Sequence, residues 1–110
     1  MKRHKSIIKV TGKCWKYVGK EIYDPFYGSC FQFAIDMPKG QAIGTDKKPP
    51  RIYVRWFGNR WIPKKGEWLE CTGTLGGVDI RERLDKSPQI NLVLMCWWDD
   101  VQRLDKEEAP

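Results

Sequence analysis

Residues Arg51 to Phe57 alternate between two kinds of side chain at every step. Side chains of a β-strand point in turn to opposite faces of its sheet, so this period of two predicts a strand. Ile52, Val54 and Trp56 fall on one face, which is suited to a core. The other face interleaves two guanidinium groups with two aromatic rings, contributed by Arg51, Tyr53, Arg55 and Phe57. Such a face suits phosphates and unstacked bases, so nucleic acid is the first partner that we consider.

Four other segments are apolar or alternating, and no long helical periodicity lies between them. The sequence therefore predicts an all-β protein, with a short helical turn after the last strand. The five strands are expected at Ser6–Tyr17, Ser29–Met37, Arg51–Phe57, Glu67–Leu75 and Gln89–Trp98. Alternation gives the further residues that should point inward: Ile8, Val10, Gly12, Cys14, Phe31, Phe33, Ile35, Leu69, Cys71, Gly73 and Leu75. The last strand is almost wholly apolar, which predicts burial on both faces or an interface between subunits.

Three long connections separate these strands. Val18–Gly28 is polar and aromatic, whereas Pro38–Pro50 and Gly76–Pro88 combine glycine or proline with basic residues. We expect the two basic connections to be adaptable loops that close around a polyanion. Their charges belong to Lys39, Lys47, Lys48, Arg81, Arg83 and Lys86.

The chain has 110 residues and a net charge of +6, from 20 Lys and Arg against 14 Asp and Glu. This length suits one domain with a single core, which we place at residues 1–104, followed by a short flexible tail at 105–110. The charge favours polyanionic partners through counterion release. No signal-like apolar run and no stretch of transmembrane length occurs, so we expect a soluble, cytoplasmic protein without a membrane partner.

Cys14, Cys30, Cys71 and Cys96 lie far apart, and His4 is the only imidazole. This spacing argues against a zinc site and favours buried, reduced thiols, although two disulfides remain an open alternative. The sequence also lacks a phosphate loop, a nucleophile elbow and a carboxylate cluster. We therefore expect no enzymatic activity, no metal site and no cofactor.

Four segments resemble bacterial single-stranded DNA-binding proteins. SIIKVTGKCW resembles their opening V-x-G-x-L strand, and SCFQFAIDM resembles their second strand and that of the related primosomal replication protein B. IYVRWFGNRW resembles the third strand, which ends in an aromatic residue followed by glycine. KKGEWLECTGTL resembles the K-K-G-x-x-V-x-V-x-G-x-L run of the fourth strand and is the most specific match. The matches keep the family's order over about Ser6 to Leu104.

The resemblance implies a five-stranded OB-fold barrel with long loops between strands 1 and 2, 2 and 3, and 4 and 5. It further implies binding of single-stranded DNA with little sequence preference, in DNA replication, recombination or repair. Implied partners are copies of the same chain, as a dimer or tetramer, and replication or recombination proteins. The link after Phe57 is shorter than the family's helix-bearing connection, and the acidic end lacks the family's apolar tip. The small size suits a phage, plasmid or other mobile element of a bacterium.

Two kinds of contact with single-stranded DNA are predicted, namely Lys and Arg on phosphates and aromatic rings on bases. Phe57 matches the aromatic residue on which the family stacks DNA, whereas Trp56 and Phe33 share parity with core residues. Tyr23, Phe26 and Tyr27 either fold over the barrel mouth or reach a strand. The candidate binding residues are Lys9, Lys13, Trp15, Lys47, Lys48, Arg51, Tyr53, Arg55, Phe57, Arg60, Trp61, Arg81 and Arg83.

Two alternative functions remain open at this point. One is an RNA-binding OB-fold, because no residue identifies a contact to the 2′-hydroxyl group. The other is a replication or primosome adaptor that acts through protein contacts of the apolar last strand, with Trp97 or Trp98 at the interface.

Overall fold

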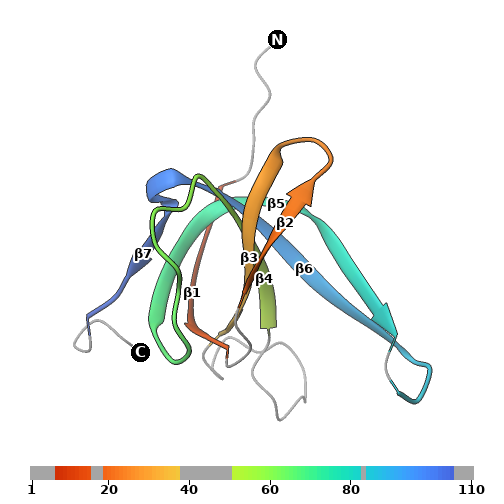
Figure 1. Ribbon diagram of the computed structural model, residues 1–110. Helices are drawn as coiled ribbons and strands as arrows, with labels where there is room; N and C mark the ends of the chain where they lie inside the picture. The colour runs from red at the N-terminus through yellow and green to blue at the C-terminus, as the bar shows by residue number, and fades with distance from the viewer. Residues whose placement is uncertain (1–6, 16–18, 38–50, 83, 106–110) are drawn as a thin grey trace.

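A computed structural model describes residues 7–15, 19–37, 51–82 and 84–105, with the backbone alone for residues 78–81 and 89–91. Figure 1 shows that these residues form strands almost throughout, which confirms the all-β prediction. The elements are β1 (Ile8–Cys14), β2 (Lys20–Asp24), β3 (Gly28–Asp36), β4 (Arg51–Phe57), β5 (Trp68–Glu82), β6 (Pro88–Trp97), the 3-10 helix η2 (Trp98–Asp100) and β7 (Val101–Arg103). Within this described part of the chain, no helix has the length and apolar character needed to cross a bilayer.

Five strands close into a ring. β1 pairs antiparallel with both β3 and β5, β3 pairs with β4, and β5 pairs with β6 in the same sense. β4 and β6 run parallel, so the order β1–β3–β4–β6–β5 returns to its first strand. β2 pairs with the first half of β3, and β7 pairs with the first half of β5. The ring encloses the core and presents an outer face on which side chains of neighbouring strands lie in rows.

The interior of the ring holds the residues that strand alternation predicts. Ile52, Val54 and Trp56 of β4 are buried there, together with Phe31, Phe33 and Ile35 of β3. The inward prediction is also confirmed for Val10, Gly12 and Cys14 of β1, and for Leu69, Cys71 and Gly73 of β5. Burial of alternate apolar residues is what fixes the register of such strands, because a shift of one residue would turn every side chain to the other face.

Leu75 is the exception among the inward residues of β5, because the structure exposes it. The pairing of β5 with β6 shifts between Leu75 and Gly77, which is the signature of a β-bulge. A bulge inserts a residue into one strand and breaks the simple alternation. The period that holds from Leu69 to Gly73 therefore does not extend to Leu75.

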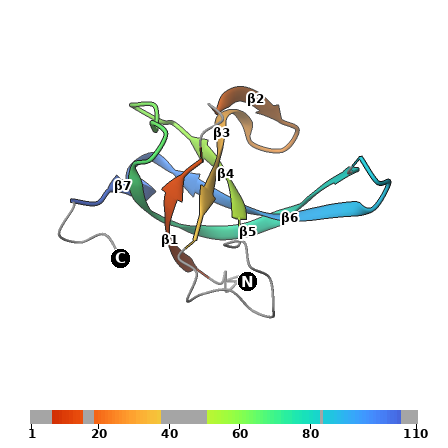
Figure 2. The ribbon, with the colours of Figure 1, turned by 90° about the horizontal axis from the view of Figure 1, so that it is seen from below.

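Two predicted loops contain strands instead. The segment Gly76–Pro88 forms most of a long β5–β6 hairpin, which projects away from the ring in Figures 1 and 2. The segment Val18–Gly28 contains β2 and a tight turn at residues 25–27. The predicted helical turn after the last strand is confirmed as η2, whereas β7 was not predicted. The predicted loop Pro38–Pro50 lies entirely outside the described residues.

The four cysteines are buried and free, which confirms the prediction of buried thiols. Burial raises the pKa of Cys96 to about 12, and the carboxylate of Asp100 adds to this rise. Burial likewise raises the pKa of Cys14 to about 11, with smaller contributions from Glu67 and Asp36. A thiolate is the reactive form of cysteine, so these thiols serve as small apolar packing groups.

Candidate nucleic-acid interface

Two rows of polar side chains cross the outer face of the ring. Lys13 of β1, Asp36 of β3 and Arg51 of β4 are register partners, and so are Lys20 of β2, Gln32 of β3 and Arg55 of β4. Directly opposed residues of neighbouring strands share a face. Between the rows, Ala34 is opposed to Tyr53. The cations that were predicted on β4 are therefore part of a wider basic surface. From here on, the outer face means this surface, made of the two rows and of the residues between them.

Arg51 is held in place by two partners on this face. Its Nε donates a hydrogen bond of 2.8 Å to Oδ1 of Asp36. Its guanidinium carbon also lies 3.5 Å from the centroid of the Trp15 ring, which is the geometry of a cation–π contact. Arg51 and Trp15 were predicted separately, and the structure brings them together. The guanidinium group is consequently oriented before any ligand arrives.

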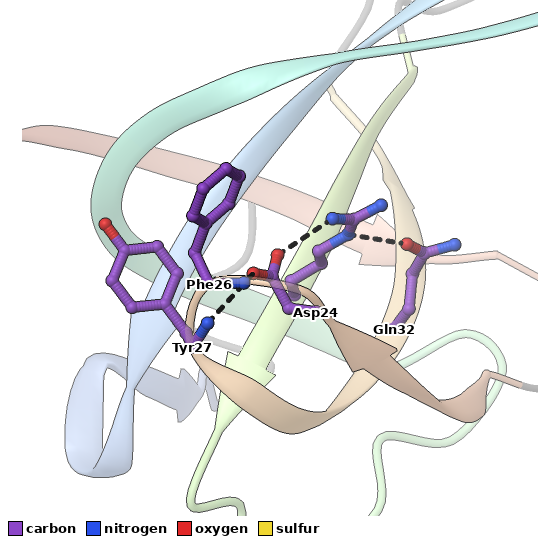
Figure 3. Close-up of polar contacts among 5 residues, drawn as sticks. Asp24, Phe26, Tyr27 and Gln32 are labelled. Atoms are coloured by element: carbon purple, nitrogen blue, oxygen red, sulfur yellow. Dashed lines mark hydrogen bonds and ion pairs between the residues drawn. The ribbon is translucent and has the colours of Figure 1, made fainter.

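Arg55 is oriented by a second set of partners (Figure 3). Its Nη1 lies 3.0 Å from Oδ2 of Asp24, and its Nε donates to Oε1 of Gln32 at 3.0 Å. Gln32 is buried, so β3 is covered on both faces rather than half-buried as alternation suggests. The side-chain contacts of Arg55 therefore join β2, β3 and β4.

Asp24 organises the turn between β2 and β3. Its Oδ1 accepts hydrogen bonds from the backbone N–H groups of Phe26 at 2.8 Å and of Tyr27 at 3.1 Å. Burial acts to raise the pKa of Asp24, but these N–H groups and the Arg55 guanidinium outweigh it, so the pKa lies below its ordinary value. The ionised carboxylate is thus the form that the fold stabilises.

Asp24→Asn is expected to lower the free energy of unfolding at pH 7 by about 1 to 3 kcal/mol, because hydrogen bonds to a charged group are lost. A lowered native pKa stabilises the fold above the unfolded-state pKa, near 3.9, and this stabilisation disappears as the pH falls through the native pKa. Urea unfolding at several pH values should therefore show the difference between wild type and variant shrinking below about pH 4. The exposed Asp99, replaced in the same way, is the control and should show no such convergence. A difference that stays constant with pH would contradict the assignment.

Phe57 does not form the open platform that its strand position suggests. Its side chain is only 5% exposed, and its ring stacks on Trp97 with a centroid distance of 5.2 Å and an interplanar angle of 22°. The ring of Tyr27 meets it edge-on at 5.7 Å. Phe57 belongs instead to a small second cluster on the outer side of the sheet, with Cys30, Val93 and Met95. The expected exposure of Phe57 is thus wrong, because the β2–β3 turn and the end of β6 cover it.

Two exposed aromatic residues lie at that turn instead. Phe26 is 88% exposed and Tyr27 is 55% exposed, although the Tyr27 ring also contacts Trp97 at 5.5 Å. Lys20 is a further exposed cation that was not among the predicted site residues. The alternating segment KEIYD followed by DPFYG is the sequence signal of this hairpin, since proline and glycine punctuate tight turns.

The remaining predicted site residues fall into four groups. Lys9 and Lys13 are exposed on β1, where Lys9 pairs with Glu70 at 3.6 Å. Arg60 and Trp61 line a separate cleft of about 480 Å³, in which the guanidinium carbon of Arg103 lies 4.0 Å from the Trp61 ring centroid. Arg81 is described by its backbone alone, within β5 rather than in a loop. The last group, which lies outside the described residues, is Lys47, Lys48 and Arg83.

No protein-family model matches this sequence, and no curated protein matches it. Solved structures do match the fold over nearly the whole chain. The mitochondrial single-stranded DNA-binding protein Rim1 of Saccharomyces cerevisiae superposes with a TM-score of 0.55 at 14% identity, covering 94% of this chain and 98% of Rim1. A Plasmodium falciparum single-stranded DNA-binding protein, in complex with single-stranded DNA, superposes with a TM-score of 0.58 at 13% identity, covering 96% and 98%.

At these identities the comparisons establish the fold. The chain has the fold of these single-stranded DNA-binding proteins, so the predicted five-stranded OB-fold is confirmed. The resemblance found in the four sequence segments is thereby confirmed at the level of the fold.

Proposed function

We propose that this protein binds single-stranded DNA with little sequence preference. The observation that carries the proposal is the outer face, where two cross-strand rows, each with two basic side chains around a central Asp or Gln, flank aromatic rings on an OB-fold. Oriented cations suit phosphates and rings suit unstacked bases. The likeness of the fold to proteins named for binding single-stranded DNA supports the same partner.

Phosphate contacts are assigned first to the two rows. Arg51 and Arg55 each use part of the guanidinium group on a neighbouring carboxylate or amide, and the remaining N–H groups face no other acceptor among the described residues. Lys13 and Lys20 are exposed and make no ion pair within the described part of the chain. These four cations lie on β1, β2 and β4, the strands that pair with β3, so a DNA backbone that crosses β3 would meet them in turn.

The other predicted contacts are proposals of the same kind. Trp15 and Tyr53 lie between the cations on the outer face and are assigned to bases. The other predicted residues lie farther from the outer face or outside the described part of the chain. They are assigned to non-specific attraction of the DNA or to contacts with nucleotides beyond the outer face: Lys9, Lys47, Lys48, Arg60, Trp61, Arg81 and Arg83. A protein of this kind protects or presents single strands in replication, recombination or repair, and acts by binding rather than by catalysis.

Arg51→Ala is expected to reduce the salt dependence of binding to an oligo-dT. Each phosphate contact on a single strand contributes about 0.7 to the slope of log K against log salt, so losing one contact should lower the slope by about that amount. The affinity should fall further than for Lys13→Ala, because removing Arg51 also uncovers the negative charge of Asp36. Titrations by tryptophan fluorescence at four salt concentrations measure both quantities.

Arg51→Lys is the matched control for this experiment. It keeps the positive charge beside Asp36 and loses the flat guanidinium group on Trp15. The slope should therefore stay close to that of the wild type. If Arg51→Ala left the slope of log K against log salt unchanged, Arg51 would not be a phosphate contact.

A further inference from the structure

A groove of about 410 Å³ lies beside the outer face, between the β2–β3 turn and the strands β5 and β6. Three aromatic residues contribute to its walls, namely Phe26 and Tyr27 from the turn and Trp97 from the end of β6. Thr74, Leu75 and Met95 complete most of the lining. Its volume lies within the range of about 300 to 1,000 Å³ that is typical of sites for small ligands.

We propose that this groove receives one unstacked nucleobase of the bound strand. The inference rests on the proposed function and adds a specific base site to it. Phe26 presents almost its whole ring to solvent at the edge of the groove, and an exposed aromatic side chain beside a cavity is suited to stacking. Trp97 is backed by Phe57, so its position in the opposite wall is fixed by packing.

The turn that carries Phe26 and Tyr27 is also held in place. Both of their N–H groups donate to the buried Asp24, which is bound in turn by Arg55. Figure 3 shows the two rings projecting from the turn on the side opposite Gln32. A binding residue whose backbone is fixed in advance loses less conformational freedom when the ligand arrives. Asp24 is therefore a positioning residue for the base site.

The charge beside the groove fits a nucleotide. Arg55 is the register partner of Met95, which lines the groove, and its guanidinium group is held by Asp24, the residue that also fixes the turn carrying Phe26 and Tyr27. Two of its N–H groups are engaged by Asp24 and Gln32, and the others donate to no acceptor in the described part of the chain, which leaves them to a phosphate oxygen. A cation next to a pocket with aromatic walls matches a base that carries its own phosphate. The same arrangement gives no comparable partner to an uncharged apolar peptide.

Phe26→Ala tests the site, because the residue is exposed and its loss should leave thermal stability unchanged. We expect the affinity for an oligo-dT to fall by about 5- to 150-fold, the range for loss of one stacked base, with the salt slope retained. Leu84→Ala removes another fully exposed apolar side chain, from the β5–β6 hairpin, and should bind as the wild type does. In parallel, an oligo-dT carrying 5-iodouracil should crosslink on irradiation to Phe26, Tyr27 or Trp97.

The variant Asp24→Asn shows whether Asp24 positions Phe26 for binding or only stabilises the fold. It should weaken binding more in the wild-type background than in the Phe26→Ala background, where only its effects on Tyr27 and Arg55 remain, whereas its loss of thermal stability should be the same in both. Equal weakening in both backgrounds would show that Asp24 does not act through Phe26.

The outcomes separate the base site from the proposed function. Failure of the wild type to bind oligo-dT would overturn both. Normal binding by Phe26→Ala, with crosslinks confined to other residues, would overturn the base site alone. A change in molar mass by light scattering in Phe26→Ala, without a change in affinity, would assign the groove to contact between copies of the chain and would also overturn it.

Discussion

Replacing Trp56 with alanine is expected to lower the free energy of unfolding by about 3 to 5 kcal/mol, the range for deleting a large buried aromatic side chain. Trp56 is only 1% exposed, and its ring centroid lies 4.8 Å from that of Trp61. Its Nε1 donates a hydrogen bond of 2.7 Å to the carbonyl oxygen of Trp98. The substitution therefore leaves a cavity inside the ring of strands, and it leaves the Trp98 carbonyl oxygen without its hydrogen-bond donor.

Chemical unfolding followed by circular dichroism measures this loss without depending on the missing fluorophore. Trp98→Ala is the matched control, since that side chain is 63% exposed and only its backbone carbonyl is needed by Trp56. The control should lose clearly less stability than Trp56→Ala. Comparable losses in the two variants would show that the inner face of β4 does not anchor the core.

Gly73→Ala is expected to have the second large effect, a loss of about 1 to 3 kcal/mol or more. A Cβ at this position would overlap the carbonyl oxygen of Met95 and come within 2.8 Å of the carbonyl carbon. It would also lie 3.1 Å from Sγ of Cys96. The obstacle is mainly backbone, which cannot rotate away as a side chain can. β5 and β6 would have to separate where they pair, beside the register pair Thr74 and Met95.

Thermal unfolding of Gly73→Ala beside Thr72→Ala measures the effect of this close approach. Thr72 is the adjacent, half-buried residue of β5, and its substitution removes atoms instead of adding one. Gly73→Ala should unfold at the lower temperature by several degrees. Equal melting temperatures would contradict the close packing of β5 on β6.

Alternation predicted the part of the fold that hydrophobic burial controls. Strands such as β3 and β4 bury every second residue in the ring, so their inner residues follow from periodicity alone. β2 and β7 were missed because they are short and mostly exposed, and only pairing with β3 and β5 holds them as strands. The position of the bulge near Leu75 depends in the same way on β6, a partner distant in sequence.

The sequence predicted the cations of the candidate site, but it did not predict the side chains that hold them in place. Arg51 and Arg55 are correctly placed on the outer side of β4, but Asp36 and Asp24 reach them only through the register of β2, β3 and β4. For Phe57 the predicted environment itself was wrong. Its strand position predicts exposure, whereas Tyr27 and Trp97 cover it through contacts that no local pattern contains.

Binding of single-stranded DNA by the outer face is tested most directly by a competition experiment. A labelled oligo-dT bound to the wild-type protein is challenged with unlabelled single-stranded DNA, duplex DNA and RNA of equal length, at one salt concentration. The chain has six tryptophans, whose quenching reports the binding of bases independently of the label. Single-stranded DNA should displace the probe at a much lower concentration than duplex DNA, because only unstacked bases can use the aromatic residues. Equal displacement by duplex DNA, or stronger displacement by RNA, would contradict the account.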